Sequence, residues 1–477
     1  MSETATQALL SLCEDRRRWK AELTADAVRK LLAEGADVHG RGRYGSTPLH
    51  SAVLAPNAKS DPRPDLEVVR ALLGAGADPN ARDAHARTPL LRAVPLNKDD
   101  SYEAHALELI HLLRAAGARV PDDVTDWNAG AFCDGGSPRI YKEVLDAGAR
   151  VDVRGYGGTT PLHRAAGYGY APMAELLLAR GADVNAMDGL GRTPLGMALR
   201  EITKPWVKAN DRLAGFNAVI ALLKGAGGLP RVTYAPSETD PFAPFPIDSA
   251  ALLAASPKGE FPFEHEVDSA QEFVTGIRAD GEPKRALALV AALRDTVGVP
   301  PRHLRLARPL ELRQPFFHHG DLEVDGSFTI RKPFAVTGNL IVHGILRDSD
   351  NDSKINILGD VRCHSLYTDG EINIRGNLHA RDVVYTYYND HVLAADTVHA
   401  RVVIEDDHGV DATVKAEHHF DLGTYNQGYG EGVGERIKAL FIDEVLQPEE
   451  EEEPRKLDRG ELFDRLEKGL PVFREKA

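Results

Sequence analysis

The stretch TPLHRAAG at residues 160–167, followed by GADVN at residues 181–185, indicates the fold of the first half of this 477-residue chain. The Thr-Pro-Leu phrase recurs at residues 47–49, 88–90 and 193–195. Thr160 and Thr193 lie 33 positions apart. A sequence period of this length is typical of a solenoid, in which each short module is stable only against its neighbours.

Each repeat encodes a pair of helices. Thr160 offers a hydroxyl that caps free amide groups, and Pro161 fits the first helical turn. The apolar run at residues 174–178 predicts a second helix, which ends at Gly181 because glycine adopts the left-handed conformation at little cost. The same glycine recurs at Gly35, Gly76, Gly117 and Gly148. We expect about six helix pairs over residues 5–229.

These phrases resemble ankyrin repeats. The resemblance implies an α-solenoid that binds a protein through its hairpin tips and the exposed positions of its first helices. It also implies that His50 and His163 bond to the backbone of the neighbouring turn and are structural. The partner-binding residues that it implies are Tyr44, His85, Tyr156 and Leu190 at the tips, and Ser51, Arg92, Arg164, Tyr168 and Met197 on the first helices. For each of them, an idle surface side chain is the alternative.

One repeat, at residues 127–148, begins with Trp127 in place of the Thr-Pro-Leu phrase but keeps the second-helix pattern and its glycine. Insertions at residues 56–65, 95–105 and 203–215 fall between the two helices of their repeats. Long surface loops cost little free energy, so neutral drift explains them as well as partner contact does.

The composition, 43% apolar and 27% charged, is that of a folded protein. The net charge of −15 argues against a general affinity for nucleic acid or anionic membranes. Residues 1–20 show no signal peptide, and no apolar run is long enough to span a membrane. The cysteines, at 13, 133 and 363, fit no metal spacing and predict buried thiols in a reduced compartment. We expect a cytoplasmic protein, and the excess of Arg over Lys hints at a bacterial source.

The middle of the chain divides into two segments. Residues 230–250 are rich in proline and phenylalanine and predict a linker that packs by its phenylalanines after the ankyrin domain at residues 1–229. Residues 251–315 predict a small helical region with two short helices between residues 269 and 297. No function is assigned to that region.

The second half alternates apolar and polar residues with period two. Leu340, Val361, Leu378 and Val398 begin related segments, at offsets of 21, 17 and 20 residues. Short strands repeating in this way predict a parallel β-helix, or β-solenoid, over residues 316–417. Residues 418–477, which include the acidic run at 449–453, predict a helical cap. The expected chain is therefore multidomain, helical at first and β-solenoid later.

The Gly-Asn-Leu phrases at residues 338–340 and 376–378 resemble the polymer-forming β-helices of the bactofilin type. That family polymerises through bare solenoid ends. Further segments precede and follow the coils of this chain, and covered ends remove unpaired strand edges. We therefore expect no filament.

The register predicts two outward rows of basic side chains. One row holds Arg362, His379 and His399, and the next holds His343, His364, Arg381 and Arg401. Coils lie about 4.8 Å apart, so stacked imidazoles stay mostly neutral at pH 7. The rows either bind an anion or an acidic partner or form a solvated polar face. We expect no metal site, because no acidic or thiol ligand joins the histidines.

No motif for a nucleophile elbow, a phosphate-binding loop or a zinc site occurs, so we expect no catalytic residues and no cofactor. The favoured function is a non-catalytic adaptor or scaffold that grips a protein with its ankyrin surface. The β-solenoid would be a second docking face or a spacer. An immunity protein that caps a basic bacterial toxin is the alternative, because the chain is acidic and its contact face is large. An enzyme is the third reading.

Overall fold

The computed structural model describes residues 2–19, 21–55, 62–94, 100–121, 137–278, 282–348, 353–387, 391–422, 432–447 and 457–474. The chain forms two compact units. The first comprises residues 1–188 and 192–232, and the second comprises residues 189–191 and 233–477. No helix among the described residues has the length and apolar character that a membrane crossing requires.

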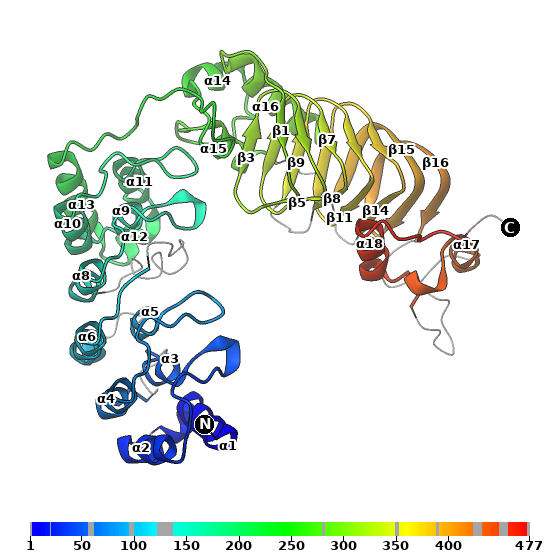
Figure 1. The fold of residues 1–477 in the computed structure, drawn as a ribbon. Coiled ribbons are helices and arrows are strands. Elements are labelled where there is room, and N and C mark those ends of the chain that lie inside the picture. Colours follow the sequence, from blue (N-terminus) through cyan, green and yellow to red (C-terminus); the bar gives the residue numbers. More distant parts are fainter. Residues whose placement is uncertain are drawn as a thin grey trace. The chain divides into compact units, whose positions relative to one another are not determined.

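The first unit is a stack of helix pairs, as predicted (Figure 1). The helices are α1 (Glu3–Glu14), α2 (Ala25–Ala33), α3 (Pro48–Ala52), α4 (Leu66–Gly74), α5 (Pro89–Ala93), α6 (Asp100–Ala115), α8 (Pro138–Asp146), α9 (Pro161–Gly167), α10 (Ala171–Ala179), α11 (Pro194–Glu201), α12 (Pro205–Ala209) and α13 (Leu213–Gly225). Short 3₁₀ turns are η1 (Arg16–Arg18), η2 (Arg43–Gly45) and η3 (Tyr156–Gly158). Trp127 and the expected start of its repeat lie outside the described residues.

The helix ends follow the predicted chemistry. The hydroxyl of Thr160 accepts a hydrogen bond from the amide of His163 at 3.4 Å, and Pro161 occupies the first turn of α9. Gly181 has a φ of +82°, and its amide donates to the carbonyl of Leu178 at 3.0 Å. The other four predicted cap glycines also have positive φ: Gly35, Gly76, Gly117 and Gly148. The cap prediction is therefore confirmed at each of them.

Two buried histidines join successive repeats. His163 Nε2 donates to the carbonyl of Arg192 in the next repeat at 2.8 Å, while its Nδ1 accepts from the amide of Thr160 at 3.2 Å. His50 does the same with Arg87 at 3.0 Å and Thr47 at 3.2 Å. The predicted structural role of both histidines is confirmed. Because each ring needs one donor and one acceptor nitrogen, the neutral imidazole is the form that fits.

One continuous apolar core runs through the first unit, from Leu9 in α1 to Leu223 in α13. Small residues such as Ala165 and Ala166 are fully buried where helices approach closely. Cys13 lies in this core, and its burial raises the pKa of the thiol to about 12. This thiol is therefore inert, as predicted for a structural cysteine.

The second unit is built on a parallel β-solenoid with three stacks of strands. The first stack is β1 (Leu304–Leu306), β4 (Leu322–Val324), β7 (Leu340–Val342), β10 (Val361–Cys363) and β13 (Leu378–Ala380). The second is β2 (Leu310–Leu312), β5 (Phe328–Ile330), β8 (Ile345–Asp348), β11 (Ser365–Thr368) and β14 (Val383–Tyr387). The third is β3 (Phe316–His318), β6 (Phe334–Val336), β9 (Lys354–Ile357) and β12 (Glu371–Ile374). The long strands β15 (Val392–Asp406) and β16 (Gly409–Asp421) close the stacks.

The predicted register is confirmed. Val361 pairs with Leu340 on one side and with Leu378 on the other, and Leu378 pairs with Val398. All four side chains are fully buried inside the coils. The solenoid begins at Leu304, because β1 pairs with β4 and β2 pairs with β5. These two strands lie within residues 251–315, which we expected to be helical.

Helices of the middle region cover the third stack. They are α14 (Ser249–Ala255), α15 (Ala270–Gly276) and α16 (Pro283–Thr296). Phe273 and Leu289 share a core with Phe317 and Ala335 of the solenoid. The expected packing of the linker by its phenylalanines is confirmed, since Phe245 meets the ring of Phe317 at 5.2 Å between centroids.

The helices after the solenoid lie against the side of the coils. They are α17 (Val433–Leu440) and α18 (Arg459–Glu467), with the turn η4 (Asp443–Val445) between them. Ile437 and Leu462 pack with Tyr385 and Ile404, which face outward from the second stack and β15. Among the described residues, the last strand β16 pairs only with β15. The C-terminal part of β16 is contacted by α17, because Arg436 donates to the carbonyl of His419 at 3.2 Å and Phe420 packs with Ile437. The absence of a filament stays a prediction.

We predict that Gly181→Val lowers the free energy of unfolding by about 1–3 kcal/mol, because a β-branched residue is strained at positive φ. A Cβ at this position meets no atom within 4 Å, so the cost is that of the backbone alone. Chemical denaturation of the full chain measures it. Gly74→Val is the matched control, because Gly74 has equally open surroundings and ordinary helical φ. Equal stability of the two variants would contradict the cap assignment.

We predict that stability falls as the pH is lowered from 7.5 to 5.5. Burial lowers the pKa of both His163 and His50 from the usual value. Below about pH 6.5 the unfolded chain therefore binds protons that the folded chain does not, which costs at most about 1.4 kcal/mol per pH unit for each histidine. Denaturation midpoints across this range measure the slope. The variant His163→Gln must show a smaller dependence of stability on pH. An unchanged slope would contradict the conclusion that His163 is buried as a neutral imidazole.

Candidate partner-binding surfaces

Tyr44 stands at the first hairpin tip with 54% of its side chain exposed. Its φ is +56°, and its carbonyl accepts a hydrogen bond from the amide of Ala84 in the next tip at 2.8 Å. The guanidinium of Arg43 lies 4.7 Å from the centre of the tyrosine ring, and the ring of His85 lies 5.8 Å away. The two tips thus present one exposed surface with aromatic and cationic character. We call Arg43, Tyr44 and His85 the tip patch.

A buried carboxylate holds the second tip in place. Asp83 accepts hydrogen bonds from the amides of His85 at 2.8 Å and Arg87 at 3.0 Å, and its carboxylate pairs with Arg92 at 2.5 Å. Burial raises the pKa of Asp83, but the hydrogen bonds from Arg87, Arg92 and His85 outweigh it and lower the pKa to about 2. Asp188 repeats part of this arrangement: it accepts from the amide of Arg192 at 2.9 Å and pairs with the guanidinium of the same residue at 2.6 Å. Both aspartates belong to the motif Asp-x-x-x-Arg-Thr-Pro-Leu, from which their role could have been predicted but was not.

The partner-binding residues predicted on the first helices differ in how accessible they are to a partner. Tyr168 is 44% exposed, whereas Ser51 is 6% exposed and therefore buried. Arg92 faces inward, pairing with Asp83 and donating to Ser46 Oγ at 3.1 Å. Arg164 and Met197 are half-buried. Tyr168 is thus the predicted first-helix residue that a partner reaches without rearrangement.

The two later tips offer less to a partner. Leu190 is half-buried, and its carbonyl accepts a hydrogen bond from Ser269 Oγ at 2.7 Å. It belongs with the second compact unit. Tyr156 begins the turn η3, and its side chain lies outside the described part of the chain.

The first basic row of the solenoid forms as predicted. Arg362 pairs in register with His379, His379 with His399, and His399 with Lys415 of β16. The two imidazole rings stack with centroids 4.7 Å apart and planes 13° apart. Partial burial, His379 and Lys415 together lower the pKa of His399. We call these four residues the cationic row.

The second predicted row lies where most of its strands have ended, so its alignment stays a prediction. Its members are His343, His364, Arg381 and Arg401. Arg381 pairs with Asp382 at 2.8 Å, and the guanidinium of Arg401 lies 3.9 Å from the ring centre of Phe473. This row is therefore partly neutralised or covered.

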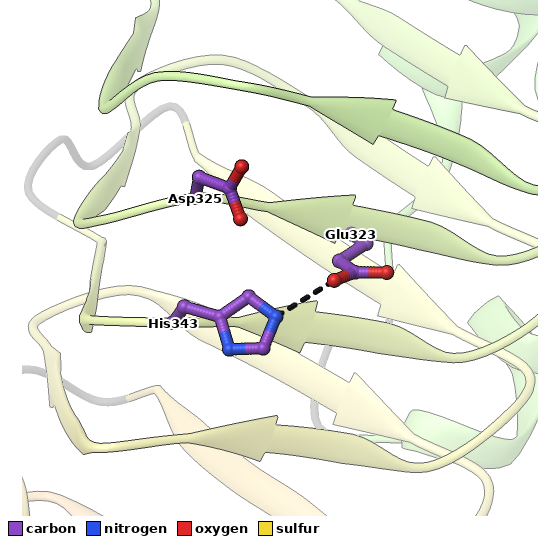
Figure 2. A group of neighbouring side chains, drawn as sticks. All are labelled: Glu323, Asp325 and His343. Carbon is purple, nitrogen blue, oxygen red and sulfur yellow. Dashed lines mark hydrogen bonds and ion pairs between the residues drawn. The ribbon is translucent and has the colours of Figure 1, made fainter.

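Two carboxylates lie beside His343, and the sequence analysis did not expect them there. Glu323 Oε1 accepts a hydrogen bond from His343 Nε2 at 2.8 Å. A ligand atom of Asp325 lies within 4.8 Å of both groups (Figure 2). The expectation of no metal site had depended on the absence of an acidic neighbour, and that premise is wrong at His343. The proximity of these carboxylates to His343 could have been predicted only by extending the strand register to the preceding coil.

One open cleft of about 160 Å³ lies in the second unit. His318 and His319 line it together with Arg302 and Phe317. His318 Nε2 lies 3.0 Å from the carbonyl of Arg302, and His319 Nδ1 lies 2.8 Å from Thr337 Oγ1. Burial lowers the pKa of both imidazoles. Both rings thus form hydrogen bonds within the turns between strands. They do not form a nucleophile–base pair.

Comparison with known proteins places the repeats of the first unit. Residues 44–84 match the family described as ankyrin repeat, and residues 144–198 match the family described as ankyrin repeats in many copies. Both matches lie within the first unit except at residues 189–191, which belong to the second.

Curated relatives match the chain over short segments. The rice potassium channel KOR2 is 39% identical over 74 residues, 16% of this chain and 10% of the channel. An ankyrin repeat-containing protein of Schizosaccharomyces pombe is 37% identical over 65 residues, 14% of this chain and 31% of that protein. The mouse ankyrin repeat and SOCS box protein 16 is 39% identical over 61 residues, 13% of this chain and 14% of that protein. The chain thus spans less than a third of the length of each of these relatives. Its N-terminal part contains ankyrin repeats, at residues 44–84 and 144–198.

Proposed function

We propose that this chain is a non-catalytic adaptor or scaffold that binds a protein through the tip patch and Tyr168. The observation that carries the proposal is Tyr44, a large aromatic residue that is 54% exposed. Exposed tyrosine and arginine are the side chains that most often dominate the energy of protein–protein binding.

The rigidity of the tip patch supports the same proposal. A backbone hydrogen bond from Ala84 to Tyr44 links the two tips, and the buried carboxylate of Asp83 fixes the second tip. A side chain that is already ordered loses less conformational entropy when a partner binds. Ankyrin repeats generally serve as protein-binding modules, so the geometry and the repeat type agree.

The cationic row supports a second docking face for an acidic segment of a protein. Arg362 and Lys415 are exposed and lack a carboxylate partner among the described residues, although the chain as a whole carries a net charge of −15. Strands about 4.8 Å apart present these cations on a rigid surface. We include a cytoplasmic location in a bacterium in the proposal; the buried thiols of Cys13 and Cys363 support a reducing compartment.

We predict that the double variant Tyr44→Ala with His85→Ala weakens partner binding at least tenfold, the effect of losing a hot spot. The partner is first captured from the native host by photo-crosslinking from position 44, and its affinity is then measured with the purified proteins. Leu213→Ala is the matched control, because Leu213 is 42% exposed in the same unit but lies at the start of α13. Unchanged affinity of the double variant would contradict the proposal. A single partner that is a basic toxin would favour the immunity-protein reading over the adaptor.

We predict that Arg362→Gln with Lys415→Gln weakens binding of a labelled poly-glutamate peptide at least fivefold at low ionic strength, because charge attraction is weakly screened there. Wild-type binding must strengthen as the pH is lowered from 7.5, because His399 gains a positive charge once the pH falls below its lowered pKa. Fluorescence anisotropy measures both effects. Arg29→Gln with Arg70→Gln is the charge-matched control on the first unit, where both arginines are exposed. Equal loss in the control would mean that net charge and not the row attracts the peptide.

A further inference from the structure

Two successive coils bring three metal-ligating side chains together on the first stack of the solenoid. Glu323 lies in β4, Asp325 directly follows that strand, and His343 directly follows β7. Because Val324 pairs in register with Val342, Asp325 and His343 are neighbours across the two strands. One ligand atom from each of Glu323, Asp325 and His343 lies within 4.8 Å of the other two (Figure 2).

We propose that Glu323, Asp325 and His343 form a binding site for a divalent transition-metal ion of the zinc class. One imidazole nitrogen and two carboxylate oxygens are a donor set that suits such ions, with water completing the coordination. Binding requires the neutral ring of His343, whose Nε2 takes the metal while the proton resides on Nδ1. The metal thereby replaces the hydrogen bond between His343 and Glu323.

The distances fit this ion without movement of the backbone. Metal–ligand bonds of about 2.0–2.2 Å place the ligand atoms of a tetrahedral site about 3.3–3.6 Å apart. The present separation of His343 Nε2 and Glu323 Oε1 is 2.8 Å, and the third oxygen lies within 4.8 Å, so small side-chain rotations suffice. The backbone is held by ladder hydrogen bonds of 2.9 Å from Asp325 N to the Leu306 carbonyl and from His343 N to the Val324 carbonyl.

His303 orients the central carboxylate. It precedes β1, and its Nε2 donates to Glu323 Oε2 at 3.1 Å. The other oxygen, Oε1, therefore points toward His343 and Asp325. The hydrogen bond from His343 keeps the pKa of Glu323 below its usual value, so the carboxylate is ionised at neutral pH. Hydrogen-bonded ligands of this kind are oriented before the metal arrives.

Arg305 competes with the metal. Its guanidinium donates to both oxygens of Asp325, at 2.9 and 3.2 Å, and approaches Glu323 Oε1 at 3.5 Å. Arg305 thus supplies the positive charge that a metal ion would otherwise supply. Its side chain is 57% exposed and can turn into solvent, so it opposes the metal without blocking the site. Removing this arginine must therefore tighten metal binding, an effect that a merely structural ion-pair cluster would not show.

Calorimetric titration of Zn²⁺ into the chelator-treated full chain tests the proposal, with Co²⁺ absorption as a second readout of the ligand set. We expect one equivalent to bind wild type, a loss of at least tenfold in affinity for His343→Gln and Glu323→Gln, and a gain of at least threefold for Arg305→Gln. Affinity must also fall from pH 7.5 to 5.5, because the imidazole has to be neutral to bind the metal. Zinc must raise the melting temperature of wild type but not of His343→Gln.

The controls separate this site from other histidines and arginines. His39→Gln removes an exposed histidine of the first unit, and Arg313→Gln removes an arginine that pairs with Glu311 at 2.9 Å on the second stack. Both must bind zinc as wild type does. Equal zinc affinity in His343→Gln and wild type, or no gain in Arg305→Gln, would overturn the proposal. Circular dichroism of each variant confirms that the surface substitutions leave the fold intact.

Discussion

Hydrogen bonds from each module to the next are the constraint on which both units depend. In the first unit, His50 and His163 donate to a carbonyl in the following repeat, at 3.0 and 2.8 Å. In the second, each coil satisfies its amides with the carbonyls of its neighbour, as Val361 N does with Asn377 O at 2.8 Å. Buried polar backbone groups are costly when they are unpaired. No repeat or coil is therefore complete by itself, and stability comes from stacking.

The same hydrogen bonds between modules hold the exposed side chains at fixed positions for recognition. Tyr44 sits on a turn whose carbonyl is bonded to the next tip, and the cationic row sits on strands whose register is fixed by pairing. The buried carboxylate of Asp83 adds a further brace by engaging two amides and two arginines. Side chains on such supports keep their spacing when the solvent changes. A surface for recognition is thus obtained without a deep pocket.

Much of this fold could be predicted from short sequence motifs, because each motif specifies one local structure. Gly181 marked a left-handed cap, and the alternation around Val361 fixed the register because a slip by one residue would expose every buried side chain. The start of the solenoid was missed, because β1 and β2 are three-residue strands set among prolines. Asp83 was missed because a buried aspartate in a turn looks like any other turn residue. Its partner Arg92 had been expected to face a binding partner.

The metal-ligating cluster shows why contacts between coils are harder to predict than the coils themselves. His343 was placed correctly on the outer surface, but Glu323 and Asp325 come from an earlier coil whose sequence, at residues 322–328, matches the repeat only in part. Aligning that fragment required the pairing of Leu322 with Leu340, which the structure supplies. A ligand set shared between coils is visible only when every register in the stack is known.

One edge of β16 is not paired with another described strand, which bears on whether the chain self-associates. Within the described residues this strand is paired along one edge, and its inward residues Val410 and Val414 are only partly buried. A long edge of this kind invites pairing unless charges oppose it. Asp411, Lys415 and Glu417 project outward from β16 and are exposed. The expectation that this chain forms no filament therefore depends on these charges as well as on the segments that precede and follow the coils.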